Sequence, residues 1–309
     1  MAASREDSAQ RLSRHKPVLL RETLQQLQLS PGLTVIDGTV GAGGHSEFIL
    51  KQIGPTGTLI GLDRDTTMLE FASQKLQGNN VTLKQSSYAD LDQVLAEMNL
   101  QGVDRILVDL GLSSDQLEHE GRGFGFSTTG QLDMRFDTTQ GRSASDLLNN
   151  ATTQDLIHIF ETYGEEKFAS SIAEAVVRRR TDSPIESVAD LNRIVEQAIP
   201  TAVQNQSDKH PATRVYQALR IAVNDELKHV EKALTETFPS SLPPGGILAV
   251  ITFHSLEDRL VKQTFQDDKL WENLTPKPIV PRPNEQKMNP RSRSAKLRVA
   301  RRISRNPQN

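Results

Sequence analysis

The chain has 309 residues and no cysteine, and its 36 Lys+Arg against 39 Asp+Glu give a formal net charge of -3 at pH 7. Without cysteine, a disulfide framework, a Cys-ligated metal site and a thiol nucleophile are excluded. No apolar run approaches the ~18 residues of a membrane span, which indicates a soluble, cytoplasmic protein. The length exceeds the ~100 to 200 residues of a usual domain, so we expect one large domain or a domain with an insertion.

Charge is unevenly distributed along the chain. From Pro276 to the C-terminus there are ten basic residues and one acidic residue, Glu285, so this tail carries +9 and the rest of the chain carries -12. Such asymmetry is typical of proteins that bind polyanions. Residues 1–14 are polar without an apolar segment, and we expect them to be disordered.

The first predicted elements are a helix over residues 17–29 and a strand over residues 33–37. A glycine-rich loop, Gly38 to Gly44, follows the strand at once, and an amphipathic stretch over residues 45–53 comes next. A strand, a glycine loop and a helix in this order open a nucleotide-binding α/β unit.

Further apolar runs predict the remaining strands, and a helical stretch covers residues 66–77. The strands are expected at residues 58–62, 81–84, 105–109, 247–253 and 297–303. Because strands and helices alternate, we predict an α/β fold with a mostly parallel, Rossmann-like sheet.

Between the fourth and fifth strands the pattern changes to helices alone. Residues 125–214 carry apolar residues at helical spacing and no strand-like run, which predicts an all-helical insertion in an α/β domain made of residues 15–124 and 215–309. From Ala212 onward, one apolar stripe predicts a single continuous helix of about seven turns that returns the chain to the sheet. The stripe consists of Val215, Leu219, Ala222, Val223, Leu227, Val230, Leu234 and Phe238.

Three features predict a cofactor site at the carboxyl edge of the sheet. The loop reads G-x-x-G-x-G-G, which departs from the G-x-G-x-x-G of dinucleotide enzymes. Asp63 closes the second strand, where a carboxylate can accept both ribose hydroxyls of an adenosine, and Asp109 closes the fourth. NAD and S-adenosylmethionine both suit this arrangement, but the acidic set of Asp37, Asp63 and Asp109 favours a sulfonium cation over a pyrophosphate. A methyltransferase is therefore favoured over a dehydrogenase.

Structural explanations compete for several of these residues. Each aspartate could cap a helix or stabilise a turn, and His45 could be a polar residue of a first helical turn. Ser255 and Asp258 are spaced nearly as a capping box, whereas His254 is less easily explained by capping and could be a buried histidine.

Ten motifs, in order along nearly the whole chain, resemble the bacterial ribosomal RNA small subunit methyltransferase H family, which is of the MraW type. They are HKPVLL (15–20), IDGTVGAGGHS (36–46), GLDRD (61–65), VDLGLSSDQL (108–117), RGFGF (122–126), LDMRFD (132–137), YGEEKFA (163–169), HPATRVYQALRIAVNDEL (210–227), FHSLEDR (253–259) and NPRSRSAKLR (289–298). Residues 266–288 and the first dozen residues lie outside the resemblance.

The resemblance implies a class I methyltransferase sheet with a helical insertion, the cofactor S-adenosylmethionine, and methylation of N4 of a cytidine in 16S rRNA, at position 1402 in conventional rRNA numbering. The cofactor contacts that it implies are Gly43, Gly44, His45, Asp63, Tyr88, Asp109 and Gln116. Tyr88 stands where the family often has Phe, and either ring can pack against adenine.

Methyl transfer from a sulfonium needs an aligned acceptor and no metal. Asp109 is the first candidate to hydrogen-bond the acceptor amine, and His254 is a further candidate proton acceptor. For the 16S rRNA of the small subunit, the basic tail is the favoured contact. Arg214 and Arg220 could contact RNA or cover a surface, and the helical insertion is a candidate RNA-recognition domain.

Two other functions stay open from the sequence: an RNA-binding ribosome assembly factor that has lost catalysis, and a methyltransferase for a protein or small molecule. Phe124 and Phe126 are expected in a lid or in the core rather than against a target base. Whether the chain forms a homodimer is also left open.

Overall fold

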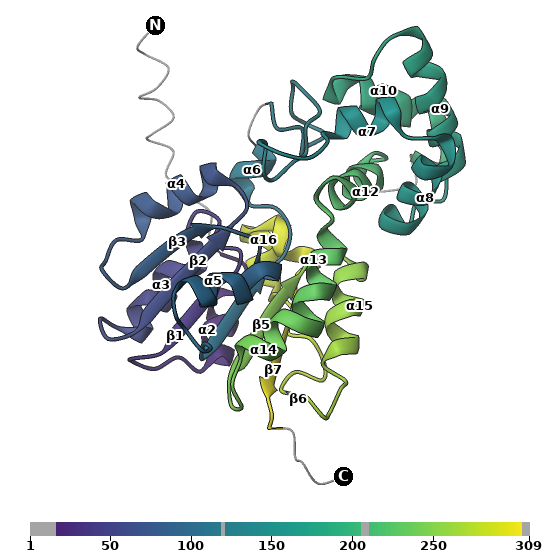
Figure 1. Cartoon of the computed structure of the whole chain (residues 1–309). Coiled ribbons are helices and arrows are strands. Elements are labelled where there is room, and N and C mark those ends of the chain that lie inside the picture. Colours follow the sequence, from purple (N-terminus) through teal and green to yellow (C-terminus); the bar gives the residue numbers. More distant parts are fainter. Residues whose placement is uncertain (1–16, 119–120, 205–209, 305–309) are drawn as a thin grey trace, which may run out of the picture. The chain divides into compact units, whose positions relative to one another are not determined.

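The computed structural model describes residues 17–118, 121–204 and 210–304, so the segment 1–14, predicted to be disordered, lies outside the described residues. The chain divides into two compact units (Figure 1). The sheet unit comprises residues 1–111 and 227–309, and the helical unit comprises residues 112–226. The helical unit therefore includes the predicted helical insertion, residues 125–214, and extends beyond it at both ends.

In the described part of the chain, the sheet has seven strands in the order β3-β2-β1-β4-β5-β7-β6. The strands β1 to β5 pair in parallel, and β7 runs antiparallel to both of its neighbours. The mostly parallel, Rossmann-like sheet predicted from the sequence is confirmed. The bounds are β1 Thr34–Asp37, β2 Thr58–Asp63, β3 Val81–Gln85, β4 Arg105–Asp109, β5 Ile247–Thr252, β6 Trp271–Asn273 and β7 Lys296–Arg302.

The central strands are apolar on both faces because both faces are covered by helices. In β4, Ile106 and Val108 belong to one buried cluster and Leu107 belongs to another. Successive side chains of a strand point to opposite faces, so a continuous apolar run fills both cores.

The helices of the sheet unit form two layers. Against one face pack α2 Leu20–Leu27, α3 Gly44–Ile53 and α4 Thr66–Lys75. Against the other pack α5 Leu91–Glu97, α13 Glu226–Lys232, the π-helical η2 Ala233–Thr237, α14 Phe238–Ser241 and α15 Ser255–Thr264. Three short elements complete the unit: η1 Tyr88–Asp90, α16 Pro283–Met288 and η3 Pro290–Ser294.

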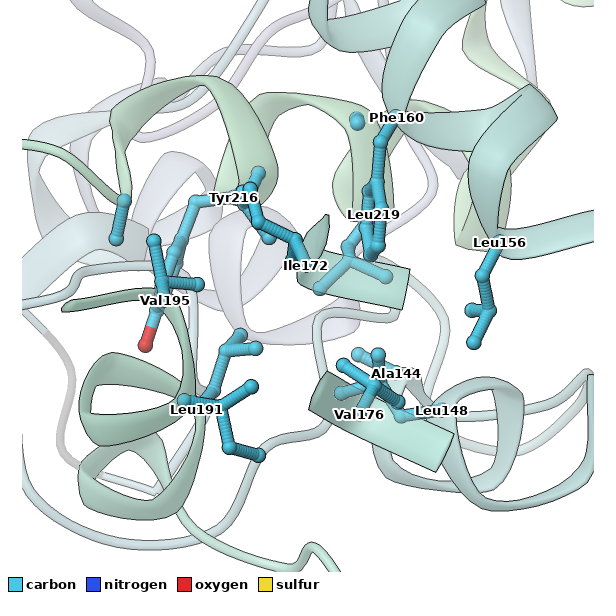
Figure 2. Close-up of a cluster of buried hydrophobic side chains, with 14 of the residues drawn as sticks. Ala144, Leu148, Leu156, Phe160, Ile172, Val176, Leu191, Val195, Tyr216 and Leu219 are labelled. Carbon is cyan, nitrogen blue, oxygen red and sulfur yellow. The ribbon is translucent and has the colours of Figure 1, made fainter. Parts of the chain in front are cut away.

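The helical unit has its own hydrophobic core. Its helices are α6 Ser114–Glu118, α7 Ala144–Asn150, α8 Thr153–Gly164, α9 Ala169–Asp182, α10 Val188–Ala198, α11 Thr201–Gln204 and α12 Thr213–Asn224. Phe160, Ile172, Val195 and Leu219 are fully buried in this core, which Figure 2 shows in close-up. Phe124 is buried in the same cluster and Phe126 packs against it, which agrees with a core role for both rings.

The prediction of one long helix after Ala212 is wrong. The helix α12 ends at Asn224, and its C-cap Asp225 has a φ of 51°, in the left-handed region. Buried Asn224 donates to the carbonyl of Met134 at 2.7 Å and accepts from the amide of Phe136 at 2.8 Å. These bonds tie the helix end to a loop of the helical unit, and α13 then begins as a new helix.

Candidate active site

Three aspartates end three adjacent parallel strands: Asp37 on β1, Asp63 on β2 and Asp109 on β4. The order β3-β2-β1-β4-β5 reverses between β1 and β4, because the chain first builds outward from β1 to β3 and then returns to the other side of β1. In open α/β sheets, ligands bind outside the carboxyl ends of the strands at such a switch point. The sequence therefore positions its acidic groups at the expected binding edge.

The glycine loop approaches its surroundings closely. Gly43 is the N-cap of α3 with a φ of 79°, and a Cβ there would lie 3.0 Å from Cγ of Leu76. A Cβ on Gly38 would lie 2.9 Å from Cβ of Tyr88. Only glycine satisfies both the positive φ and the close approach at position 43, so the loop can lie against Leu76 at the start of α3.

Backbone amides fix the orientation of the Asp63 carboxylate. The amide of Gly41 donates to its Oδ2 and the amide of Asp65 donates to its Oδ1, each at 2.9 Å. Each oxygen keeps a further lone pair, so the carboxylate can still accept hydroxyl groups. Asp65 itself caps α4 by accepting from the amide of Thr67, which leaves the capping role to Asp65 rather than to Asp63.

The side chains of Asp109 and His45 lie next to each other inside the sheet unit. Nε2 of His45 lies 2.9 Å from the carbonyl oxygen of Val18, and because a carbonyl only accepts, this nitrogen carries the proton. Nδ1 of His45 is 3.6 Å from Oδ2 of Asp109. His45 is 5% exposed, so it is a buried member of the site rather than a polar residue on the surface of a first turn.

Burial shifts the pKa values of the three aspartates and of His45. It raises the pKa of Asp37 to about 6 and the pKa of Asp63 to about 6. It also raises the pKa of Asp109 well above its usual range, and the carboxylates of Asp37 and Glu257 raise it further. Burial lowers the pKa of His45 to about 4, so this imidazole is neutral at pH 7 and its Nδ1 is unprotonated.

The acidic side chains of the site are not paired with cations in the described part of the chain. Among the described residues, none of Asp37, Asp63 and Asp109 has a Lys or Arg partner, and Oδ1 of Asp109 is buried without a hydrogen-bond partner. Buried carboxylates are costly unless a cation or hydrogen-bond donors compensate them. A ligand that carries a positive charge and hydroxyl groups therefore fits these acidic side chains, which accept hydrogen bonds.

Two predicted cofactor contacts, Tyr88 and Gln116, lie outside the group of acidic side chains and His45. Tyr88 is half-buried in η1 next to the glycine loop, and its ring centroid lies 6.2 Å from that of Phe238. Gln116 belongs to the helical unit. Its Oε1 accepts a hydrogen bond from the backbone amide of Ser113, and its own backbone amide donates to Oγ of Ser113. The cofactor roles of both residues stay predictions.

The loop after β5 gives a different capping arrangement from the one considered in the sequence. His254 is the N-cap of α15 and forms the capping box with Glu257, whose Oε1 lies 2.9 Å from Nε2 of His254. Ser255 and Asp258 do not form the box, because Asp258 pairs with Arg298 at 2.7 Å and with Lys296 at 2.9 Å. His254 thus has a structural role, and proton acceptance by it stays a prediction.

Two supporting contacts escaped the sequence analysis. Oγ1 of Thr39 accepts from the backbone amide of Asp109 at 2.7 Å, and Oγ of Ser46 donates to Oδ2 of Asp37 at 2.7 Å. They join the glycine loop to β4 and α3 to β1. A single hydroxyl group in a loop or in a first helical turn carries no sequence signal of its own, so these bonds could not be predicted.

With a seven-stranded Rossmann-like sheet and acidic side chains at its binding edge, the protein is an S-adenosylmethionine-dependent methyltransferase. Within the described residues, no group of three or more His, Asp or Glu side chains could hold a metal ion, and no helix is both long and apolar enough to cross a bilayer.

Comparison with known proteins identifies the family. The MraW methylase family matches residues 12–303, so the chain belongs to this family. The Ribosomal RNA small subunit methyltransferase H of Trichlorobacter lovleyi is 42% identical, over 94% of this chain and 98% of that protein. The proteins of the same name from a Sulfurihydrogenibium species and from Dictyoglomus thermophilum are 46% and 44% identical, over 94% and 93% of this chain and 99% and 96% of theirs.

Proposed function

We propose that this enzyme transfers a methyl group from S-adenosylmethionine to N4 of a cytidine in the 16S rRNA of the small ribosomal subunit, at position 1402, in the cytoplasm. Family membership and the names of relatives that match along almost their whole length support the ribosomal RNA substrate. The observation that carries the chemistry is the half-buried side chain of Asp109 beside the glycine loop, whose buried Oδ1 has no hydrogen-bond partner among the described residues.

The binding edge suits each part of the cofactor. Asp63, oriented by two backbone amides, would accept the ribose hydroxyls, and Tyr88 would pack against the adenine. Gly43 and Gly44 would let the backbone at the start of α3 approach the ligand, with His45 beside them and Gln116 as a further contact. S-adenosylmethionine supplies an electrophilic methyl group on a sulfonium, which the uncompensated carboxylates favour.

Asp109 is suited to activate the acceptor amine. The lone pair of a cytosine N4 amine is conjugated with the ring, and a hydrogen bond from the amine to an oxygen acceptor strengthens as the new bond forms. Because the pKa of Asp109 is well above the usual range, its ionised form is also a better proton acceptor than an ordinary carboxylate. The neutral His45, held by Val18, faces Oδ2 and leaves Oδ1 for the amine.

The test compares wild type with Asp109→Asn on unmodified small ribosomal subunits. Asparagine keeps the shape of the side chain but cannot take a proton, so we expect single-turnover methyl transfer to fall by about 10²- to 10⁴-fold. Because Asp109 is also an implied cofactor contact, cofactor affinity measured by calorimetry should fall too, but by far less than the rate, since Asp63 and the glycine loop remain.

Three results of this test would contradict parts of the proposal, and each points to a different explanation. Transfer by Asp109→Asn at the wild-type rate would contradict the role of Asp109. Tight cofactor binding by wild type without transfer to the subunits would instead favour an RNA-binding assembly factor, and label on a protein would favour a different acceptor class.

A further inference from the structure

The surplus positive charge lies outside the helical unit. Residues 112–226 contain 11 Lys+Arg and 18 Asp+Glu, whereas the remaining residues contain 25 and 21. Binding of a polyanion through phosphates depends on Lys and Arg. On charge alone, the acidic helical unit is the less suitable of the two to bind RNA phosphates.

Arg214 and Arg220, the two basic residues of the helical unit that the sequence singled out, already have partners within that unit. Nε of Arg220 lies 2.8 Å from Oε1 of Glu226 in a largely buried pair, and Arg214 donates to the carbonyl of Glu165. Arg180 donates to the carbonyls of Leu148 and Ala151.

Four of the ten basic residues of the tail already have partners within the sheet unit. Within β7, Lys296 and Arg298 pair with Asp258, and Arg301 pairs with Glu272. Arg302 donates to backbone carbonyls. The strand lies between β5 and β6, so these cations stabilise the sheet unit and are not a free RNA-binding tail.

Five others lie in residues 276–294, a folded stretch that we call the basic segment, and the tenth, Arg305, lies outside the described residues. The basic segment contains these five basic residues and one acidic residue. Lys277, Lys287 and Arg293 are exposed and have no ion pair among the described residues. Arg282 remains 69% exposed although its Nε lies 3.5 Å from Oε1 of Glu22.

The basic segment is fixed to the sheet unit at several points. Its acidic residue, Glu285, accepts a hydrogen bond from the backbone amide of Leu19 at 2.7 Å, and Ile279 forms a bridge with Leu297 of β7. Leu19 follows Val18, whose carbonyl holds His45 next to Asp109. The anchor of the segment and the active site are therefore joined through two consecutive residues.

We propose that the basic segment is the surface through which this enzyme binds the phosphate backbone of ribosomal RNA. The inference rests on the proposed function and adds to it where the substrate is bound. Cations on a folded segment that is anchored to the active site position the RNA without reading its bases.

The test is the salt dependence of binding to unmodified small ribosomal subunits. In the triple variant Lys277→Gln, Lys287→Gln, Arg293→Gln, each lost phosphate contact reduces the slope of log affinity against log salt concentration by about one, so the slope should fall by about three. Affinity at low salt should fall on the order of tenfold or more. Cofactor affinity and thermal stability should stay at wild-type values, because the three side chains are exposed and lie outside the cofactor site.

The matched control is Arg142→Gln, Lys167→Gln, Arg193→Gln, which removes three exposed cations of the helical unit that also have no ion pair among the described residues. We expect it to keep the wild-type slope. A reduced slope in this control with an unchanged slope in the basic-segment variant would overturn the inference and favour the helical unit. Absence of salt-dependent binding by wild type would contradict the proposed function as well, so the two failures are distinguishable.

Discussion

At the scale of single residues, the site combines buried and half-buried carboxylates that have no Lys or Arg partner in the described part of the chain. Asp37 and Asp63 end neighbouring strands, and burial raises the pKa of each to about 6. Sequence reasoning could place these groups, because the last residue of a parallel strand lies at the binding edge whatever the rest of the fold. It could not give their ionisation, which depends on how completely the surrounding loops cover them.

The raised pKa values predict that cofactor affinity depends on pH. Above about pH 6 both carboxylates are ionised and attract the sulfonium, and as the pH falls through 6 they become protonated and this attraction is lost. S-adenosylhomocysteine has a neutral thioether in place of the sulfonium. Between pH 7.5 and pH 5, we therefore expect S-adenosylmethionine to lose affinity by on the order of tenfold more than S-adenosylhomocysteine. Calorimetric titration of both ligands checks this, and equal losses would show that the carboxylates do not act on the sulfonium.

At the scale of elements, apolar patterning predicted the longer strands well and the helix breaks poorly. The strand β4 was predicted at its observed bounds because Ile106, Leu107 and Val108 fill both cores. The short β6 carries only Trp271 as a buried apolar residue, too little to predict a strand. The long stripe after Ala212 continues across Asp225, so periodicity alone could not show the break, which depends on partners about 90 positions earlier in the chain.

The helix break predicts a strong effect of Asn224→Ala on stability. This change leaves the carbonyl of Met134 and the amide of Phe136 without their side-chain partner in a buried environment. Each unsatisfied buried group costs about 1 to 3 kcal/mol, so we expect the free energy of unfolding to fall by about 3 kcal/mol in denaturant titration.

Asn150→Ala is the matched control, since Asn150 is exposed and, among the described residues, its side chain donates to the carbonyl of Asp146 alone. It should change the free energy of unfolding by less than about 1 kcal/mol. Equal effects of the two substitutions would mean that Asn224 does not hold the helix end.

At the scale of the whole molecule, the two units differ in net charge and in the functional residues that they contain. The sheet unit holds the acidic binding edge and the basic segment, while the helical unit carries the negative surplus. The composition of the tail predicted a polyanion partner, but it could not distinguish the cations that stabilise β7 from those left exposed in residues 276–294, because that division depends on the ion pairs of Asp258 and Glu272.

The most direct test of the proposed function is the product itself. Wild-type protein is incubated with methyl-labelled S-adenosylmethionine and unmodified small ribosomal subunits, and the digested 16S rRNA is analysed by mass spectrometry. We predict a single labelled nucleoside, N4-methylated cytidine, from position 1402. Label on another nucleoside or on a ribosomal protein, or no label despite bound cofactor, would contradict the proposed function.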